Sequence, residues 1–230
     1  MKRLVSLLWL LAVCGLARLA VPSAKADIIT VASNPNLTIP DNDFNGVANT
    51  ISLSTPITSI TSLSMTLGIA GGYNGDFYAY LRHGTSGFAV LLNRVGQTSS
   101  NPYGYGDSGL NVTFSDLAAN GDIHAYANVV DPAGGTLTGL WQPDARHDSL
   151  SSTRDAMLSN FNGMDPNGDW TLFVADLSPV GIGTLANWSL TIEGTGTTFA
   201  IPDGGSTLAL ASAALMTLAG LKARWQVHRR

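Results

Sequence analysis

Apolar and polar residues alternate with a period of two along the middle of the chain. Because successive side chains of a strand point to opposite faces of a sheet, this period predicts strands with one buried and one wet face. The clearest runs start at Ile51, Leu63, Phe77, Leu110, Trp170 and Trp188. Clusters of Gly, Asn, Asp and Pro between the runs predict turns. The pattern therefore predicts an all-β fold, an antiparallel sandwich or jelly roll, in which 152–161 is the one short helical candidate.

Both ends of the chain depart from this pattern, and residues 1–26 have the composition of a secretory signal peptide. Two basic residues precede an apolar run over 4–16, and the run is followed by the small-residue cleavage site Ala24-Lys25-Ala26. The run is shorter than the ~20 residues of a membrane-spanning helix, and an uncleaved anchor is the alternative. Cys14, the only cysteine, lies in this run, so the mature chain needs neither a disulfide nor a thiolate metal site.

The C-terminal end combines a Gly-rich linker at 195–201, a short polar motif, an apolar segment at 208–221 and a basic terminus. Such a segment is expected to stall in the inner membrane with its positive charges in the cytoplasm. The polar motif consists of Pro202, Asp203, Gly204 and Gly205. The order of these parts over 202–230 resembles the PEP-CTERM class of bacterial sorting tails. The resemblance implies an exosortase-like processing enzyme as a partner and the cell envelope, the cell surface or the extracellular space as the destination. A short permanent anchor is the alternative.

The charge of the chain changes once both ends are set aside. All 16 acids lie between residues 27 and 203, where only four arginines oppose them. This part therefore carries a net charge of −12, whereas the whole chain carries −4. Because so acidic a surface repels polyanions, nucleic acid and anionic lipid are not expected as partners.

One stretch carries the lettering of a subtilisin-type serine peptidase, with His83, Ser86 and Asp107 inside HGT, GTS and DSG. A catalytic triad needs its three side chains on separate parts of a scaffold. Here the histidine and the serine share one short segment, their motifs overlap, and the acid follows both of them. The stretch instead predicts a β-hairpin with strands at 77–81 and 88–93, and we assign no catalytic residue.

The hairpin is part of a longer pattern. Residues 158–176 are LSNFNGMDPNGDWTLFVAD, and residues 183–192 are GTLANWSLTI. These sequences resemble the P/Homo B domain, which follows the catalytic domain in kexin- and furin-like convertases. The pattern is carried by Phe161, Gly163, Trp170, Asp176, Gly183 and Trp188.

The resemblance covers 74–193, is weaker over 27–73, and departs at His83, where the family commonly has proline, and in 131–150. It assigns 27–194 to a single domain. It implies a jelly-roll-like sandwich of about eight or nine strands. It also implies a domain that stabilises a neighbouring peptidase and has no catalytic activity itself.

Tryptophans supply one kind of candidate site. Trp170 and Trp188 have the phase of inward-facing strand residues and are expected in the core, with a sugar-stacking platform as the alternative. Trp141 lies outside the strand pattern, so it is the candidate for an exposed aromatic contact. The charged residues that follow it, at 144–155, are expected to form a solvated loop.

Carboxylate side chains supply the other kind of candidate site. Asp165, Asn167 and Asp169 place oxygen atoms at alternate positions of one loop, as calcium ligands do. Since sandwich loops bring distant turns together, a Ca²⁺ site could combine this loop with Asp76 or Asp176. Capping of turns by the same side chains is the alternative.

These observations predict an exported, acidic, non-enzymatic sandwich. Its expected role is structural or adhesive, through contacts with extracellular polysaccharide or a surface protein. The alternative is an accessory domain that acts in trans on a secreted subtilisin-like serine peptidase.

Overall fold

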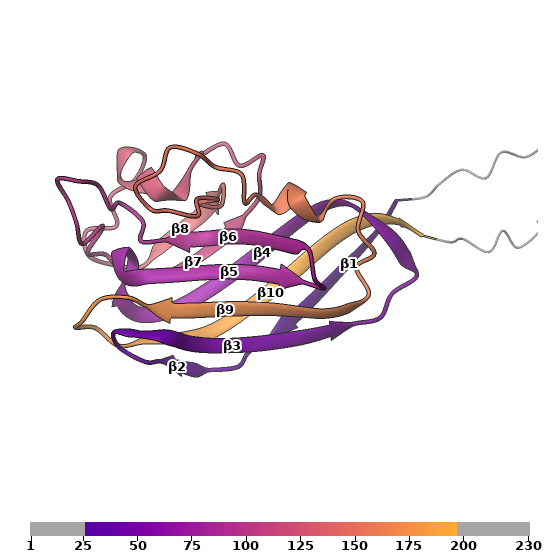
Figure 1. Ribbon diagram of the computed structural model, residues 1–230, viewed down its shortest axis with the longest axis horizontal. Helices are drawn as coiled ribbons and strands as arrows, with labels where there is room; N and C mark the ends of the chain where they lie inside the picture. The colour runs from indigo at the N-terminus through magenta and orange to yellow at the C-terminus, as the bar shows by residue number, and fades with distance from the viewer. Residues whose placement is uncertain (1–25, 197–230) are drawn as a thin grey trace, which may run out of the picture. The chain divides into compact units, whose positions relative to one another are not determined.

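The computed structural model describes residues 26–196, which form a sandwich of two β-sheets (Figure 1). Sheet A has the strand order β1–β10–β4–β7–β8, and β2 also pairs with β10; sheet B has the order β3–β9–β5–β6. The strands of sheet A are β1 (Ala26–Ser33), β2 (Leu37–Ile39), β4 (Ile57–Tyr73), β7 (Ser108–Phe114), β8 (Leu137–Trp141) and β10 (Gly183–Gly196). Those of sheet B are β3 (Asp43–Leu53), β5 (Phe77–His83), β6 (Gly87–Asn93) and β9 (Gly168–Asp176). The expected all-β sandwich is confirmed.

Short 3₁₀ helices complete the described part: η1 (Asn74–Asp76), η2 (Ile123–Asn128) and η3 (Leu158–Phe161). The strand pairings within 26–196 are antiparallel except for β7 with β8, which run parallel. Parallel neighbours need a crossover connection, and the segment between them, which contains η2, supplies it. None of the helices between residues 26 and 196 has the length and apolar character that crossing a membrane requires.

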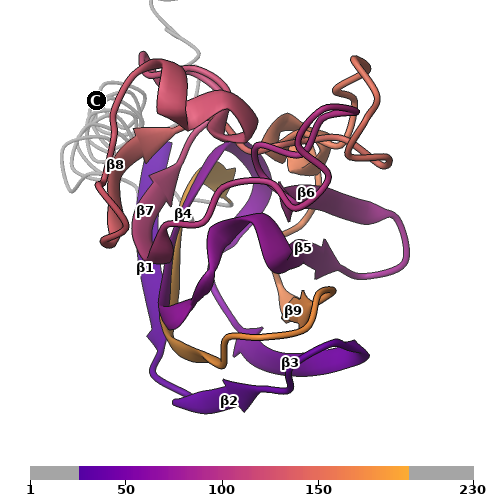
Figure 2. The same ribbon diagram turned by 90° about the vertical axis from the view of Figure 1, so that its left-hand side faces the viewer.

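The core lies between the two sheets, which Figure 2 shows from one end of the sandwich. Strand alternation turns Leu67 and Trp188 inward from sheet A, and Leu81, Trp170 and Leu172 inward from sheet B. Their side chains are at most 1% exposed. Trp170 and Trp188 are therefore core residues, as their phase in the sequence predicts.

Each buried tryptophan has a hydrogen-bond acceptor for its indole N–H, which burial would otherwise leave unpaired at a cost. Trp170 Nε1 donates to the Pro166 carbonyl at 2.8 Å, and Trp188 Nε1 donates to Asn49 Oδ1 at 2.8 Å. Trp141 Nε1 donates to the Thr138 carbonyl at 2.9 Å.

The structure corrects three expectations. Trp141 is the last residue of β8 and is fully buried, so the exposed aromatic contact expected there is wrong. The short helical candidate at 152–161 is helical only in its last four residues, which form the 3₁₀ helix η3. Strand β10 runs to Gly196, two residues into the expected linker at 195–201. The signal peptide expected over 1–26 lies outside the described residues except for Ala26, and the sorting motif and tail expected over 202–230 lie outside them entirely.

Candidate functional site

The residues of the peptidase-like motifs, His83, Ser86 and Asp107, do not form a catalytic group. His83 ends β5, its ring is stacked on the Trp170 ring at 4.1 Å between centroids, and its side chain is almost fully buried. Its Nδ1 lies 3.0 Å from the Asp169 carbonyl oxygen and its Nε2 lies 2.8 Å from that of Asp165. Both ring nitrogens are thus directed at backbone oxygens, and neither is free to act as a base on a serine.

Asp107, the acidic residue of these motifs, forms hydrogen bonds with other parts of the chain. Its Oδ2 accepts a hydrogen bond of 2.7 Å from the Tyr126 hydroxyl, and its Oδ1 accepts one of 2.8 Å from the Gly134 N–H. Ser86 lies in the turn between β5 and β6. These three positions therefore belong to a hairpin and a loop contact, which agrees with the sequence interpretation.

The calcium candidates fall into two groups that lie apart. Strands β5 and β9 pair antiparallel, with Phe77 opposite Asp176 and His83 opposite Trp170. Six residues of strand separate these pairs, or about 20 Å at the rise of a β-strand. Asp76 and Asp176 therefore lie at one end of sheet B and the 165–169 loop lies at the other. The expected site that combines them is wrong, because the register of β5 and β9 holds them apart.

The 165–169 loop caps turns. Asp165 Oδ1 accepts hydrogen bonds from the backbone N–H and the side-chain amide of Asn167, at 2.9 and 2.7 Å. These bonds lower the pKa of Asp165. Asn167 also accepts from the Thr55 N–H at 2.6 Å, and Asp169 accepts from the Ser52 hydroxyl at 2.5 Å. Between residues 26 and 196, no three His, Cys, Asp or Glu side chains are grouped to hold a metal ion.

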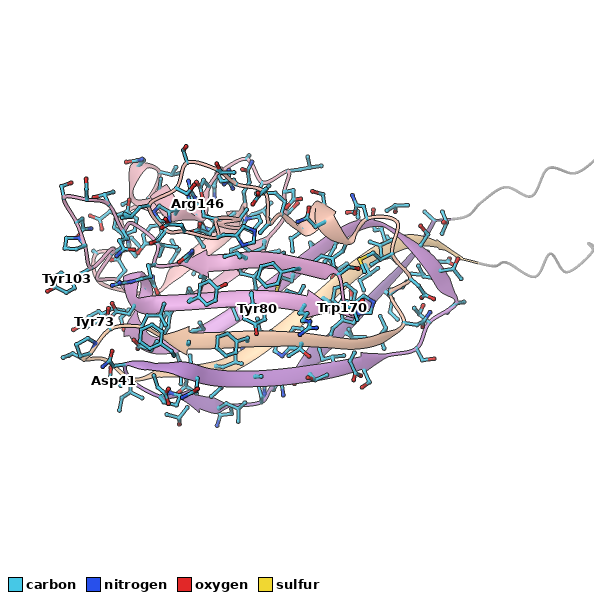
Figure 3. All side chains as sticks on the ribbon, in the orientation of Figure 1. Asp41, Tyr73, Tyr80, Tyr103, Arg146 and Trp170 are labelled. Carbon is cyan, nitrogen blue, oxygen red and sulfur yellow. The ribbon has the colours of Figure 1, made fainter. Side chains whose placement is uncertain are left out.

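The outer face of sheet B carries an aromatic cluster that the sequence analysis missed. The Tyr80 ring stacks on Phe173 at 4.8 Å and lies 5.2 Å from the Phe88 ring. Tyr78 lies 6.0 Å from Tyr80, and His147 stacks on Phe88 at 5.8 Å. We call Tyr78, Tyr80, Phe88 and Phe173 the aromatic face; Tyr80 is labelled in Figure 3. All four side chains are half-buried, so part of each ring contacts solvent.

A shallow pocket of about 360 Å³ adjoins the aromatic face. Tyr80 and Arg82 line it from β5, and Asn167, Asp169 and Thr171 line it from β9 and the preceding loop. An aromatic ring, a guanidinium group and a carboxylate side by side can make apolar, stacking and polar contacts with another molecule. The sequence does contain an indication of this face. Aromatic residues occupy strand positions that point away from the core, where a fully solvated strand has polar residues.

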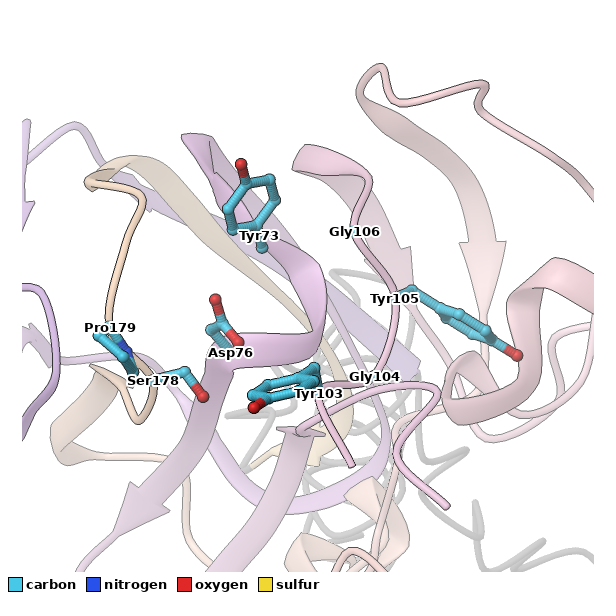
Figure 4. A pocket seen from close by; sticks show the side chains of 8 residues that line it. All are labelled: Tyr73, Asp76, Tyr103, Gly104, Tyr105, Gly106, Ser178 and Pro179. Atoms are coloured by element: carbon cyan, nitrogen blue, oxygen red, sulfur yellow. The ribbon is translucent and has the colours of Figure 1, made fainter. Parts of the chain in front are cut away.

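A second pocket lies at the other end of the sandwich and has an acidic floor (Figure 4). Its volume is about 230 Å³, and we call it the end pocket. Its lining includes Tyr73 from the end of β4, Asp76 from η1, Tyr103 from the loop after β6, and Ser178 and Pro179 from the loop after β9. Figure 3 places Asp41, Tyr73 and Tyr103 at this end of the molecule.

The carboxylates at the end pocket are buried and close to one another. Asp76 is 4% exposed and Asp176 is fully buried. Burial and the neighbouring charges of Asp76 and Asp41 raise the pKa of Asp176 to about 6, although backbone N–H groups of Ser178 and Asn42 oppose the shift. Burial also raises the pKa of Asp76, against the Ser178 hydroxyl and the charge of Arg94. One oxygen of Asp176, Oδ2, has no hydrogen-bond partner.

A third polar cluster lies under the loops beside β6. Asp144 is fully buried, with Oδ2 2.7 Å from His124 Nδ1 and Oδ1 3.1 Å from Arg146 Nη1. Burial lowers the pKa of His124, but the hydrogen bond and charge of Asp144 outweigh it, so the pKa is raised overall. Arg146 also pairs with Asp122. The solvated loop expected at 144–155 is therefore wrong for Asp144 and Arg146, because the Asp144 carboxylate ties this segment to η2. It is confirmed for His147 and Asp155, whose side chains are exposed.

Comparison with protein families agrees with the sequence resemblance over part of the chain. The family model described as the proprotein convertase P-domain matches residues 121–192. The match covers about a third of the chain and spans η2, β8, η3, β9 and most of β10. No curated protein matches the chain.

Two similar solved structures contain the serine protease of Aeromonas sobria. The structure of the protease is 13% identical with a TM-score of 0.43, and its complex with the chaperone ORF2 is 14% identical with a TM-score of 0.44. The similarity covers 75% and 76% of this chain and 28% of each of those chains. The chain thus spans less than a third of the length of these structures.

Proposed function

We propose that this chain is an exported, non-catalytic P domain that serves as an accessory domain to a secreted subtilisin-like serine peptidase. The observation that carries the proposal is the match of residues 121–192 to the proprotein convertase P-domain family. Of the two hypotheses from the sequence, the family match favours the accessory role over the structural or adhesive one. Export through the signal peptide, and sorting by an exosortase-like enzyme to the cell surface, complete the proposal and rest on the sequence of the two ends.

The aromatic face is the surface that we assign to the peptidase. Tyr and Phe rings supply large contact areas at little cost in side-chain entropy, and they are enriched in the centres of protein interfaces. Tyr80 and Phe173 are held in place by their mutual stacking across β5 and β9. The face is therefore organised before a partner arrives, which lowers the entropic cost of association.

Co-purification tests the proposal. The full chain, tagged and expressed in its producer, is isolated under mild conditions, and bound serine peptidases are labelled with a fluorophosphonate probe. We expect a labelled subtilisin-like peptidase with the native chain and a loss of at least tenfold with the double variant Tyr80→Ala and Phe173→Ala. Ile28→Ala, which shortens a 65% exposed side chain on sheet A, is the control and retains the peptidase.

Two results contradict the proposal. Either no serine peptidase accompanies the chain while the producer's polysaccharide binds to it, or the peptidase is retained equally by the double variant. The first result restores the adhesive hypothesis, and the second removes the aromatic face as the contact surface. Peptide hydrolysis by the purified chain that is lost in His83→Ala would support an enzyme instead.

A further inference from the structure

The end pocket has a rigid frame. Gly75 in η1 and the loop at 103–105 approach so closely that a Cβ on Gly75 would lie 2.4 Å from the Tyr103 carbonyl oxygen. The Gly75 N–H donates to the Tyr105 carbonyl at 2.8 Å, which fixes this approach. Gly181 packs against the Tyr73 ring on the opposite side, with 3.1 Å from the site of a Cβ to the ring. The walls of the pocket are thus positioned by backbone contacts before any ligand binds.

Two exposed aromatic rings flank a carboxylate in this pocket. Tyr73 is 42% exposed and Tyr103 is 72% exposed, whereas Asp76 between them is almost completely buried. Figure 4 shows the Asp76 side chain between the two rings, with Ser178 beside it. The faces of aromatic rings attract cations, and a desolvated carboxylate attracts them more strongly than an exposed one does.

Negative charge at the pocket is not neutralised by ion pairs. In the described part of the chain, Asp41, Asp76 and Asp176 form no salt bridge with a basic side chain. Arg94 is the basic residue whose charge acts on Asp76, but its guanidinium donates to the Gly75 and Pro102 carbonyls and to the Ser178 hydroxyl.

The size and chemistry of the pocket select the kind of cation. A volume of about 230 Å³ corresponds to roughly eight water molecules, which exceeds the space that a bare metal ion occupies. A planar guanidinium group stacks on tyrosine and presents five N–H donors, whereas an ammonium group is a compact point charge. The net charge of −12 over 27–203 draws a positively charged surface toward the domain.

We propose that the end pocket binds an arginine side chain that projects from the surface of a protein partner. The guanidinium group lies between the Tyr73 and Tyr103 rings and donates to the Asp76 carboxylate. This binding does not require the accessory role, because the pocket is separate from the aromatic face. A failure of one proposal therefore leaves the other intact.

Titration calorimetry at low ionic strength tests the proposal with the full chain and three blocked tripeptides, Gly-Arg-Gly, Gly-Lys-Gly and Gly-citrulline-Gly. Citrulline has nearly the shape of arginine but no charge. We expect the arginine peptide to bind at least tenfold more tightly than the citrulline peptide and more tightly than the lysine peptide. Added salt weakens the binding of the arginine peptide.

Matched variants assign the binding to the pocket. Asp76→Asn keeps the shape of the side chain and is expected to weaken arginine binding at least tenfold, while Asp169→Asn leaves it unchanged. Tyr103→Ala removes an exposed ring that folding does not need, and it is expected to weaken binding severalfold. Leu117→Ala, which shortens a 93% exposed side chain away from the pocket, is its control.

Three outcomes overturn the proposal. The citrulline peptide binds as tightly as the arginine peptide, or neither Asp76→Asn nor Tyr103→Ala weakens the binding. In the third outcome, the pocket takes another ligand: calcium chloride alone, or a neutral saccharide such as maltose, binds in a way that Asp76→Asn abolishes and prevents arginine binding.

Discussion

Replacing Asp176 with asparagine is expected to stabilise the protein at neutral pH, although the residue is fully buried and belongs to the family pattern. The folded state raises the pKa of this carboxyl to about 6 from the ordinary value of 3.8. Between these two pH values the folded state binds a proton that the unfolded state has released, so stability falls as the pH rises. The difference between these two pKa values corresponds to about 3 kcal/mol of stability lost by pH 7.

Asparagine removes the charge and keeps the shape. Its Oδ1 can accept the hydrogen bond that Asp176 Oδ1 accepts from the Ser178 N–H at 3.1 Å, and its amide replaces the unpartnered oxygen. Weakening of the charge-assisted hydrogen bonds costs about 1 kcal/mol. We therefore expect Asp176→Asn to raise the free energy of unfolding by about 2 kcal/mol at pH 7.5, and to change it by less than about 1 kcal/mol at pH 4.

Urea unfolding followed by tryptophan fluorescence at pH 4, 5, 6 and 7.5 measures the effect. The decisive measurement is the pH dependence of the unfolding free energy. The native protein is expected to lose stability between pH 4 and pH 7, whereas the variant lacks the titrating group and does not show this decline. Asp165→Asn is the control, since hydrogen bonds lower the pKa of Asp165, and its variant is not stabilised at neutral pH. If Asp176→Asn destabilises the protein equally at every pH, the reasoning is refuted and the carboxylate serves as a structural acceptor.

Two further predictions concern the frame of the end pocket and the buried cluster of His124 and Asp144. Gly75→Ala is expected to destabilise the protein by about 1–3 kcal/mol, because its Cβ would overlap the backbone of the 103–105 loop. The control is Gly106→Ala, which has open space around its Cβ and is expected to change the unfolding free energy by less than about 0.5 kcal/mol. Equal urea midpoints for these two variants would contradict the predicted close approach. The raised pKa of His124 contributes stability below its unfolded pKa of about 6.5, and this contribution is lost as the pH rises through the folded pKa. His124→Gln should therefore cost about 2 kcal/mol at pH 6 and less at pH 9 in thermal or urea unfolding, and an equal cost at both pH values would show that the charge of His124 is not involved.

The strands and the main core residues could be predicted from the sequence because both follow from local periodicity. Trp170 and Trp188 share a phase with their apolar neighbours, and that phase alone turns them inward. Trp141 could not be placed in the same way, since its strand has five residues, includes Gly139 at a φ of 109°, and pairs in parallel with β7. The burial of Trp141 depends on the pairing of β8 with β7, a strand that is distant in the sequence.

The candidate sites were less predictable because each depends on the register between strands. The composition of the loops indicated that Asp76 and Asp165 could serve one site, but the pairing of β5 with β9 separates them. The same pairing brings Tyr80 onto Phe173 and so creates the aromatic face. The end pocket joins segments that follow β4, β6 and β9, and no short-range pattern in the sequence indicates that they meet.

The first and last strands of the described chain, β1 and β10, pair with each other. Ala26 lies opposite Thr195, so the two ends of the described chain emerge side by side from one pole. Strand β10 starts at Gly183, near the end pocket, and its 14 residues extend about 40 Å to Gly196. An attachment through either end, to a membrane or to another domain, would therefore hold the end pocket at the opposite end of the sandwich, far from the point of attachment.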